Sequence, residues 1–190
     1  MVKGKNKIKY NLKNVHYAKI TETDGKITWG KPTAIPGAVS LSLDAEGDTS
    51  TFYADGVAYY VSVTNNGYSG DLEMALITDE FRTDILGDVK DTKNVLTENA
   101  DATVKAFALL FQFDGDVNGI RHVLYNCKAT RPTIESETKE DTIEPKTETL
   151  SLTVSPMADG RVKAKTTDET DETTYNGWFD NVYEAQAAEV

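Results

Sequence analysis

The segment 114–119, with the sequence DGDVNG, comes closest in residue types and spacing to a known binding chemistry. It matches the first half of an EF-hand loop, in which oxygen ligands alternate along the chain and coordinate calcium. The second half does not match, because the closing bidentate acid would fall at Tyr125 and the flanking residues predict strands, whereas an EF-hand needs helices. We therefore favour a hairpin turn at this position, with calcium as the less favoured alternative.

Other reactive side chains are few and form no recognisable catalytic pattern. The histidines are His16 and His122, and His122 lies in a predicted strand beside Arg121, where a structural role is commoner than catalysis. The single cysteine, Cys127, falls in an apolar alternating segment that predicts burial. The 31 acidic residues contain no isolated pair of the kind that a glycosidase needs. We expect no catalytic residue, no cofactor and no metal site, so the chain is predicted not to be an enzyme.

Charge is distributed unevenly along the chain, whose formal net charge is −11. Residues 1–31 contain eight lysines against Glu22 and Asp24, which gives +6 and leaves −17 for residues 32–190. A basic arm on an acidic body can bind nucleic acid, bind an acidic protein surface such as another copy of the chain, or stay solvated. We favour the protein surface, because the acidic body would repel a duplex that carries about one negative charge per 1.7 Å.

Length and hydropathy indicate one globular domain with extensions at both ends. The 190 residues are enough for one sizeable core. No apolar run approaches the roughly 20 residues of a membrane helix, and no apolar segment follows the basic N-terminal residues, so we expect neither a membrane protein nor Sec export. The predicted units are a basic arm at 1–14, a β domain at 15–167 with an acidic loop at 135–148, and an acidic linker with a docking segment at 168–190.

The stretch 52–87 contains the strongest local pattern. Residues 57–64 are mostly β-branched or aromatic, and Asn65-Asn66-Gly67 has the residue types of a tight turn, so we expect a hairpin with a second strand at 71–77. Residues 79–86 are predicted to form a two-turn helix with Asp79 as N-cap and Gly87 just past its end.

Two apolar groups are predicted to pack on the β domain. Ile77, Phe81 and Ile85 recur every four residues and should face the sheet from the helix. Near the C-terminus, Trp178, Phe179 and Val182 are too apolar for a free tail, so we expect them to dock on the body or on a neighbouring chain.

The remaining strands are expected in hairpins, with polar loops between them. This arrangement predicts a mainly β fold, an antiparallel sandwich or barrel with one short flanking helix. Polar loops are expected at 45–51 and 88–102. The further strands are predicted at 15–21, 26–29, 38–43, 103–113 and 120–129, and at 150–154 paired with 161–165.

Two stretches also resemble a known family. Residues 53–87 read YADGVAYYVSVTNNGYSGDLEMALITDEFRTDILG, and residues 177–184 read GWFDNVYE. Both resemble the major tail proteins, the tail-tube subunits, of long-tailed, non-contractile phages and prophages of Gram-positive bacteria. The resemblance extends over about residues 15–183 and is strongest at 53–87.

The resemblance implies a structural virion protein that self-assembles. In that family, β-sandwich subunits form hexameric rings, and stacked rings make a tube through which DNA leaves the capsid without specific binding. The implied partners are further copies of the chain and tail-tip, tape-measure and tail-terminator proteins, and the implied location is the virion tail after synthesis in the bacterial cytoplasm. Mapped onto this chain, the regions 57–77 and 103–129 would line the lumen, loop 45–51 or 88–102 would project to the next ring, and the arm lysines would contact that ring: Lys3, Lys5, Lys7 and Lys9.

Two other classes of protein remain as alternatives. One is a carbohydrate-binding or adhesive β-sandwich module with an aromatic sugar platform formed by Tyr53, Tyr59, Tyr60, Tyr68 and Trp178. Strand alternation argues against it, because Tyr59 and Tyr60 should point to opposite faces. The other is an enzyme with an unrecognised carboxylate site.

Overall fold

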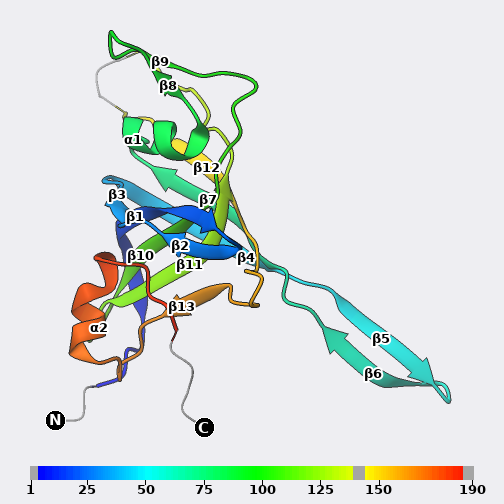
Figure 1. Cartoon of the computed structure of the whole chain (residues 1–190). Helices are drawn as coiled ribbons and strands as arrows, with labels where there is room; N and C mark the ends of the chain where they lie inside the picture. Colours follow the sequence, from blue (N-terminus) through cyan, green and yellow to red (C-terminus); the bar gives the residue numbers. More distant parts are fainter. Residues whose placement is uncertain (1–3, 139–143, 186–190) are drawn as a thin grey trace.

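Antiparallel strands dominate the computed structural model, which describes residues 4–138 and 144–185 (Figure 1). The predicted mainly β, sandwich-like fold class is confirmed. The main sheet has the order β2-β1-β10-β11-β12-β7-β4, with β3 also paired to β1 and β13 to β11. Its strands are β1 (Lys9–Thr23), β2 (Lys26–Trp29), β3 (Thr33–Ala34), β4 (Ala38–Glu46), β7 (Gly67–Met74), β10 (Phe107–Gly115), β11 (Ile120–Ala129), β12 (Glu148–Val154) and β13 (Lys163–Lys165).

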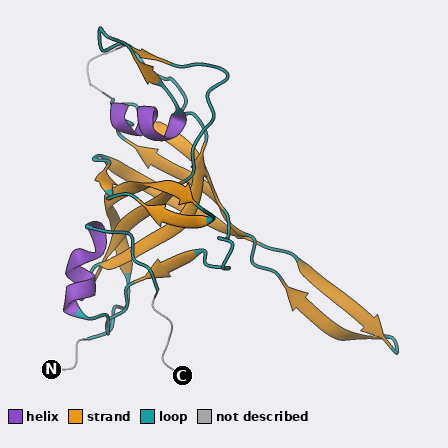
Figure 2. Ribbon diagram, viewed as in Figure 1, coloured by secondary structure: helices purple, strands orange, loops and turns teal. Residues whose placement is uncertain are grey.

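Two small hairpins and two short helical segments complete the described fold (Figure 2). The hairpins are β5 (Thr49–Ala54) with β6 (Val57–Val63), and β8 (Val89–Lys90) with β9 (Leu96–Thr97). The helical segments are α1 (Asp79–Phe81), which continues as a π-helical turn over Arg82–Leu86, and α2 (Glu172–Asn176), which continues as a 3-10 turn over Gly177–Phe179. No helix among the described residues has the length and hydropathy of a transmembrane span.

The sheet curls around the larger of two cores. The last strand of the sheet order, β4, is brought near β1 because Ile35, which follows β3, donates its backbone N–H to the Val15 carbonyl at 2.8 Å, and β4 begins only three residues later. Phe107, Leu109 and Phe111 of β10 lie in this core, facing apolar side chains of β7 and β12. The α1 segment covers the core, because Phe81 is fully buried and its ring meets those of Tyr17 and Phe107 edge-on at 5.1 and 5.3 Å.

The second core lies on the opposite face of β1, β10 and β11. Ala108 and Leu110 alternate with the residues of the first core and pack beneath Trp178 and Val182 of the C-terminal segment. Burial on both faces explains why residues 107–111 form a continuous apolar run without polar alternation.

The expected hairpin between 57–64 and 71–77 is wrong. Strand β6 pairs with β5 across Asp55-Gly56, whose φ angles of 52° and 77° suit the two-residue turn of a twisted hairpin. Strand β7 pairs instead with β4 and β12. Gly67 begins β7 with φ 105° and lets that strand approach β12, because a Cβ at Gly67 would overlap the Val154 carbonyl. The polar stretch 45–51, expected as a loop, is strand for most of its length, because β4 extends to Glu46 and β5 begins at Thr49.

The expected pairing of 150–154 with 161–165 is also wrong. β12 and β13 both pair with β11, through residues 127–129 and 122–124 respectively. They lie end to end along one edge of β11, and the turn between them closes with a 2.8 Å bond from Met157 N–H to the Arg161 carbonyl. The turn residues at 157–160 predict a hairpin, but the two strands that flank them pair with a third strand, β11.

Smaller differences have local causes. β1 begins at Lys9, not at residue 15, and contains irregularities at Asn11 and Asn14, whose φ angles of 52° and 54° interrupt its alternation. The helix N-cap is Thr78, not Asp79, because its hydroxyl accepts from Phe81 N–H at 3.3 Å; Gly87 ends the segment at φ 87°. Residues 168–174, expected as a linker, include the start of α2, which Asp171 caps through Thr174 N–H at 2.8 Å.

Candidate assembly surfaces

The β5–β6 hairpin extends away from the body and pairs only within itself in the described structure (Figure 1). Its large apolar side chains are 52–73% exposed, and they occur on both strands. A lone two-stranded hairpin is marginally stable in water, and an exposed apolar surface of this kind marks an interaction site. The exposed residues are Phe52, Tyr53, Val57, Tyr59, Tyr60, Val61 and Val63.

The base of the hairpin is anchored to the sheet by a hydrogen-bonded ladder. Thr64 N–H donates to the Asp48 carbonyl at 2.9 Å, and Asn66 N–H donates to the Glu46 carbonyl at 2.8 Å. The Thr64 hydroxyl in turn accepts from Asp48 N–H at 2.8 Å. The strand pair β4–β7 thus continues into β5–β6, which gives the projecting arm a defined direction.

A second surface, the outer face of β4, β7 and β12, is polar and acidic. The inward residues of these strands enter the first core, so the alternate residues point to solvent. The three strands contain no Lys, Arg or His. Their outward side chains are Ser40, Ser42, Asp44, Glu46, Ser69, Asp71, Glu73, Thr149, Ser151 and Thr153.

Hydroxyl groups hold the carboxylates of this outer face in place. Glu73 accepts from Thr147 at 2.7 Å and from Ser40 at 2.8 Å, and these two hydrogen bonds lower the pKa of Glu73. Asp71 accepts from Ser151 at 2.7 Å, and Glu46 accepts from the Ser69 hydroxyl. The outer face therefore carries fixed negative charge next to β4, the last strand of the sheet order.

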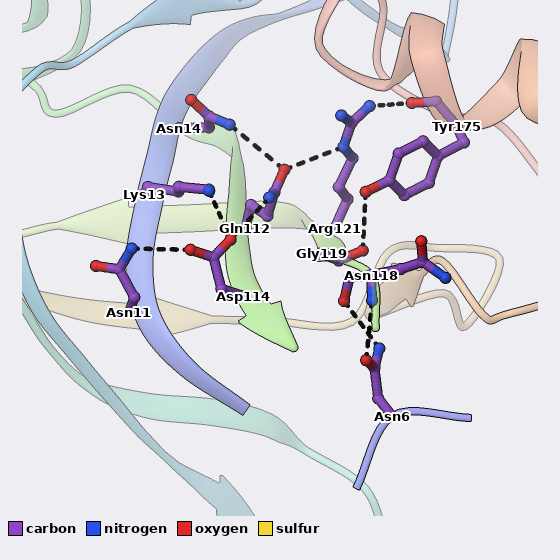
Figure 3. Close-up of polar contacts among 10 residues, drawn as sticks. All are labelled: Asn6, Asn11, Lys13, Asn14, Gln112, Asp114, Asn118, Gly119, Arg121 and Tyr175. Carbon is purple, nitrogen blue, oxygen red and sulfur yellow. Dashed lines mark hydrogen bonds and ion pairs between the residues drawn. The ribbon is translucent and has the colours of Figure 1, made fainter. Parts of the chain in front are cut away.

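The DGDVNG turn binds the N-terminal segment of its own chain (Figure 3). Asn6 inserts into the turn, donating to the Asn118 carbonyl at 2.9 Å and accepting from the N–H groups of Val117 and Asn118 at 2.9 and 3.0 Å. Asp116 accepts from Lys7 N–H at 2.7 Å, and this bond lowers the pKa of Asp116. The predicted hairpin turn is confirmed, and its two carboxylates are occupied by groups of the chain itself.

The neighbouring Asp114 fixes the start of β1. Its carboxylate lies 2.6 Å from Lys13 and accepts from Asn11 at 2.9 Å, and both contacts lower the pKa of Asp114. Within the described residues, no group of three or more His, Cys, Asp or Glu side chains is placed to hold a metal ion.

The C-terminal segment is held at the opposite side of the same turn. The Arg121 guanidinium lies 3.9 Å from the centre of the Tyr175 ring and also donates to the Tyr175 carbonyl. The Tyr175 hydroxyl donates to the Gly119 carbonyl at 3.1 Å (Figure 3). Trp178 and Val182 are buried, Phe179 is partly buried, and Trp178 Nε1–H donates to the His122 carbonyl at 3.3 Å. The segment thus docks on its own chain.

The arm lysines and the helix residues occupy very different environments. Lys5, Lys7 and Lys9 are exposed, and Lys3 lies outside the described residues. Ile77, Phe81 and Ile85 are fully buried in the first core.

Burial shifts the pKa values of two side chains that were considered for chemistry, His122 and Cys127. Burial, with a smaller effect from Lys165, Lys163 and Lys9, lowers the pKa of His122 to about 4, and its ring stacks on Phe111 at 5.0 Å. Burial raises the pKa of Cys127 to about 12, so its thiol stays protonated.

The aromatic platform expected of a sugar-binding module is not assembled. Trp178 is buried and Tyr68 lines a pocket at the end of the sheet, whereas Tyr53, Tyr59 and Tyr60 lie on the projecting hairpin. The register shifts by one residue at Tyr59, so the simple alternation between Tyr59 and Tyr60 does not hold either.

Sequence reasoning did not identify the acidic outer face or the free hairpin. A signal for the outer face is present, since Ser or an acid occupies every second position over 40–46 and again over 69–73. The hairpin signal was the Asp55-Gly56 pair between two β-rich runs.

Comparison with protein families identifies the family of this chain. The model described as phage tail tube protein matches residues 4–189, which is nearly the whole chain. Comparison with curated proteins finds no match.

Proposed function

This chain belongs to the phage tail tube protein family and so has a structural role in the phage tail, and we propose that its copies form hexameric rings that stack into a conduit for genomic DNA. The observation that supports self-assembly best is the β5–β6 hairpin, whose apolar side chains are exposed on both strands. A second copy would cover this surface, because the projecting arm meets no core of its own chain.

The outer face of β4, β7 and β12 is proposed to line the lumen. Fixed carboxylates without neighbouring cations on these strands repel the phosphates of passing DNA. The previously expected lining by 103–129 is not supported, because the central residues of β10 and β11 are covered on both faces by their own chain. Among the described residues β4 pairs with β7 alone, and its other edge is proposed to extend the sheet towards a neighbouring subunit.

The arm lysines are proposed to contact the adjacent ring. Asn6 and Lys7 are held at the 114–119 turn, so Lys5, Lys7 and Lys9 are presented from a fixed point on the body. An acidic face of the next ring is their proposed partner, and Lys3 is included from its place in the sequence. Replacing all four lysines with Ser should leave a folded subunit that makes shorter tubes; wild-type tube length would exclude this role.

The subunit is further proposed to act with other tail proteins. A tube of defined length needs an initiating tail-tip complex, a tape-measure protein in its lumen and a terminator at its end. The proposed location is the virion tail, after synthesis in the cytoplasm of the bacterial host.

Size-exclusion chromatography with negative-stain electron microscopy tests the function directly. The purified chain should form six-fold rings or tubes as the protein concentration rises. Replacing residues 49–63 by a short Gly-Ser linker should give a folded monomer. Circular dichroism verifies the fold of the shortened variant. A wild-type chain that stays monomeric at high concentration would contradict self-assembly.

A further inference from the structure

A pocket at the open end of the curled sheet combines aromatic walls with positive charge. It has a volume of about 180 Å³ and lies between β1, β4, β7, β10, β11 and β13. Rings and ammonium groups dominate its lining, and none of the lining residues is acidic: the residues that matter here are Lys9, Tyr68, Phe111, Phe113, His122 and Lys163.

The two lysines sit against the rings without a carboxylate partner in the described part of the chain. Lys9 Nζ lies 5.2 Å from the centre of the Phe113 ring, and Lys163 Nζ lies 4.4 Å from that of Tyr68. No ion pair with either lysine occurs among the described residues. His122 is neutral near pH 7, because its pKa is lowered to about 4, so it adds a flat apolar wall and no competing charge. The pocket thus suits an anionic group next to an apolar or aromatic one.

The tip of the β5–β6 hairpin has this combination of groups. Asp55 is the single charged residue in 49–63, and it lies at the turn. Tyr53, two residues before it, is 67% exposed, and Val57, two residues after it, is 59% exposed. A carboxylate flanked by exposed apolar side chains therefore ends an arm that extends away from the body (Figure 1).

We propose that the Asp55 tip of one subunit's β5–β6 hairpin docks into the Lys9–Lys163 pocket of a second copy of this chain, with Tyr53 against the aromatic walls. The inference rests on the proposed self-assembly and adds its partner surface. Tip and pocket are different surfaces of one molecule, so the contact is heterologous and can repeat from copy to copy, as a ring or a tube requires. A buried charge pair between aromatic walls also favours one docking register over others.

Charge reversal within one chain tests the pairing. Asp55→Lys should lower the yield of rings and tubes at least tenfold, and Lys9→Asp with Lys163→Asp should do the same. Combining the three substitutions should restore assembly, because every copy then carries a basic tip and an acidic pocket. Asp24→Lys is the matched control, since Asp24-Gly25 forms the β1–β2 turn with φ angles of 52° and 74°, nearly those of Asp55-Gly56. Normal assembly of the Asp55→Lys variant, or no recovery in the combined variant, overturns the proposal.

A cross-linking measurement separates this proposal from the proposed function. After oxidation by dissolved oxygen with a copper catalyst, Asp55→Cys with Lys163→Cys should give a ladder of disulfide-linked copies on a non-reducing denaturing gel, whereas Asp24→Cys with Lys163→Cys should not. The native Cys127 is fully buried and should not interfere. Wild-type tubes without a ladder would overturn the docking while the tube function stands. A ladder without tubes would support the docking and contradict the tube function. If the pocket lysines instead bind a short single-stranded oligonucleotide and their reversal leaves tubes intact, the pocket is a nucleic-acid site and the proposal is wrong.

Discussion

Strands β10 and β6 have similar apolar sequences, but β10 is buried and β6 is exposed. Residues 107–113, FALLFQF, and 57–63, VAYYVSV, are both dense in apolar residues that favour strands. The residues 107–111 are buried by their own chain on both faces, whereas every residue of β6 except Ser62 is exposed. The side-chain chemistry differs accordingly, since β10 uses Phe and Leu, while β6 uses Tyr and Val. Tyrosine presents an apolar ring with a polar tip, so it tolerates water before a partner covers it.

A dense run of apolar residues therefore indicates that a strand has to be buried, but it does not indicate whether its own chain or another molecule buries it. In β10 the cover comes from α1 on one face and from the C-terminal segment on the other. In β6 it has to come from another copy if the proposed assembly is correct. Substitutions in the two regions should therefore separate folding from assembly.

The largest effect on folding is expected at Phe81, which covers β10. Phe81→Ala should lower the free energy of unfolding by about 3–5 kcal/mol, because it leaves a cavity between the Tyr17 and Phe107 rings. Urea denaturation of the monomer provides the measurement. A change below about 1 kcal/mol would show that the helix contributes little to covering the sheet.

The second largest effect on stability is expected from protonation of His122, which lies on β11, the strand beside β10. Its pKa is about 4 in the folded chain against 6.5 for the free side chain, so between these values the unfolded chain binds more protons. Stability should therefore be fully present above pH 6.5 and should fall by about 3 kcal/mol as the pH drops to 4.

Denaturation curves across this pH range check the sign of the effect. His122→Gln should flatten this part of the profile, whereas His16→Gln, which leaves His122 in place, should keep it. An unchanged slope in the His122 variant would show that other groups cause the pH dependence.

A smaller effect is expected at the helix that covers β10. Thr78→Ala removes the hydroxyl that accepts from Phe81 N–H and should cost about 1 kcal/mol of stability. Thr78→Ser keeps the cap and should stay close to wild type, as thermal unfolding of the two variants would show.

The smallest effect on folding is expected in the projecting hairpin. Tyr60→Ser should change the stability of the monomer by less than about 0.5 kcal/mol, because the side chain is 64% exposed and has no core around it. The same variant should assemble poorly when rings and tubes are counted by electron microscopy. A large loss of monomer stability would show that the hairpin folds against its own body in solution.

Local signals predicted parts of the fold well. The helical segment after Thr78 and the β10–β11 hairpin occur where turn and cap residues indicated them. Both rely on contacts between residues close in sequence, which composition and periodicity encode directly.

The errors concern long-range pairing. Asn65-Asn66-Gly67 resembled a hairpin turn, but the flanking strands pair with β5 on one side and with β4 and β12 on the other. No local pattern distinguishes these partners, since any of them satisfies the same backbone groups. The exposed β5–β6 hairpin was missed for a related reason, because its two strands have the apolar, β-branched and aromatic composition of core strands.

The hydroxyl-held carboxylates of β4 and β7 have a consequence for the conditions under which a virion works. The lowered pKa of Glu73 means that this side chain keeps its charge in media acidic enough to begin neutralising an ordinary glutamate. Where Glu73 lines the proposed lumen, its charge would therefore continue to repel DNA phosphates as the surroundings acidify.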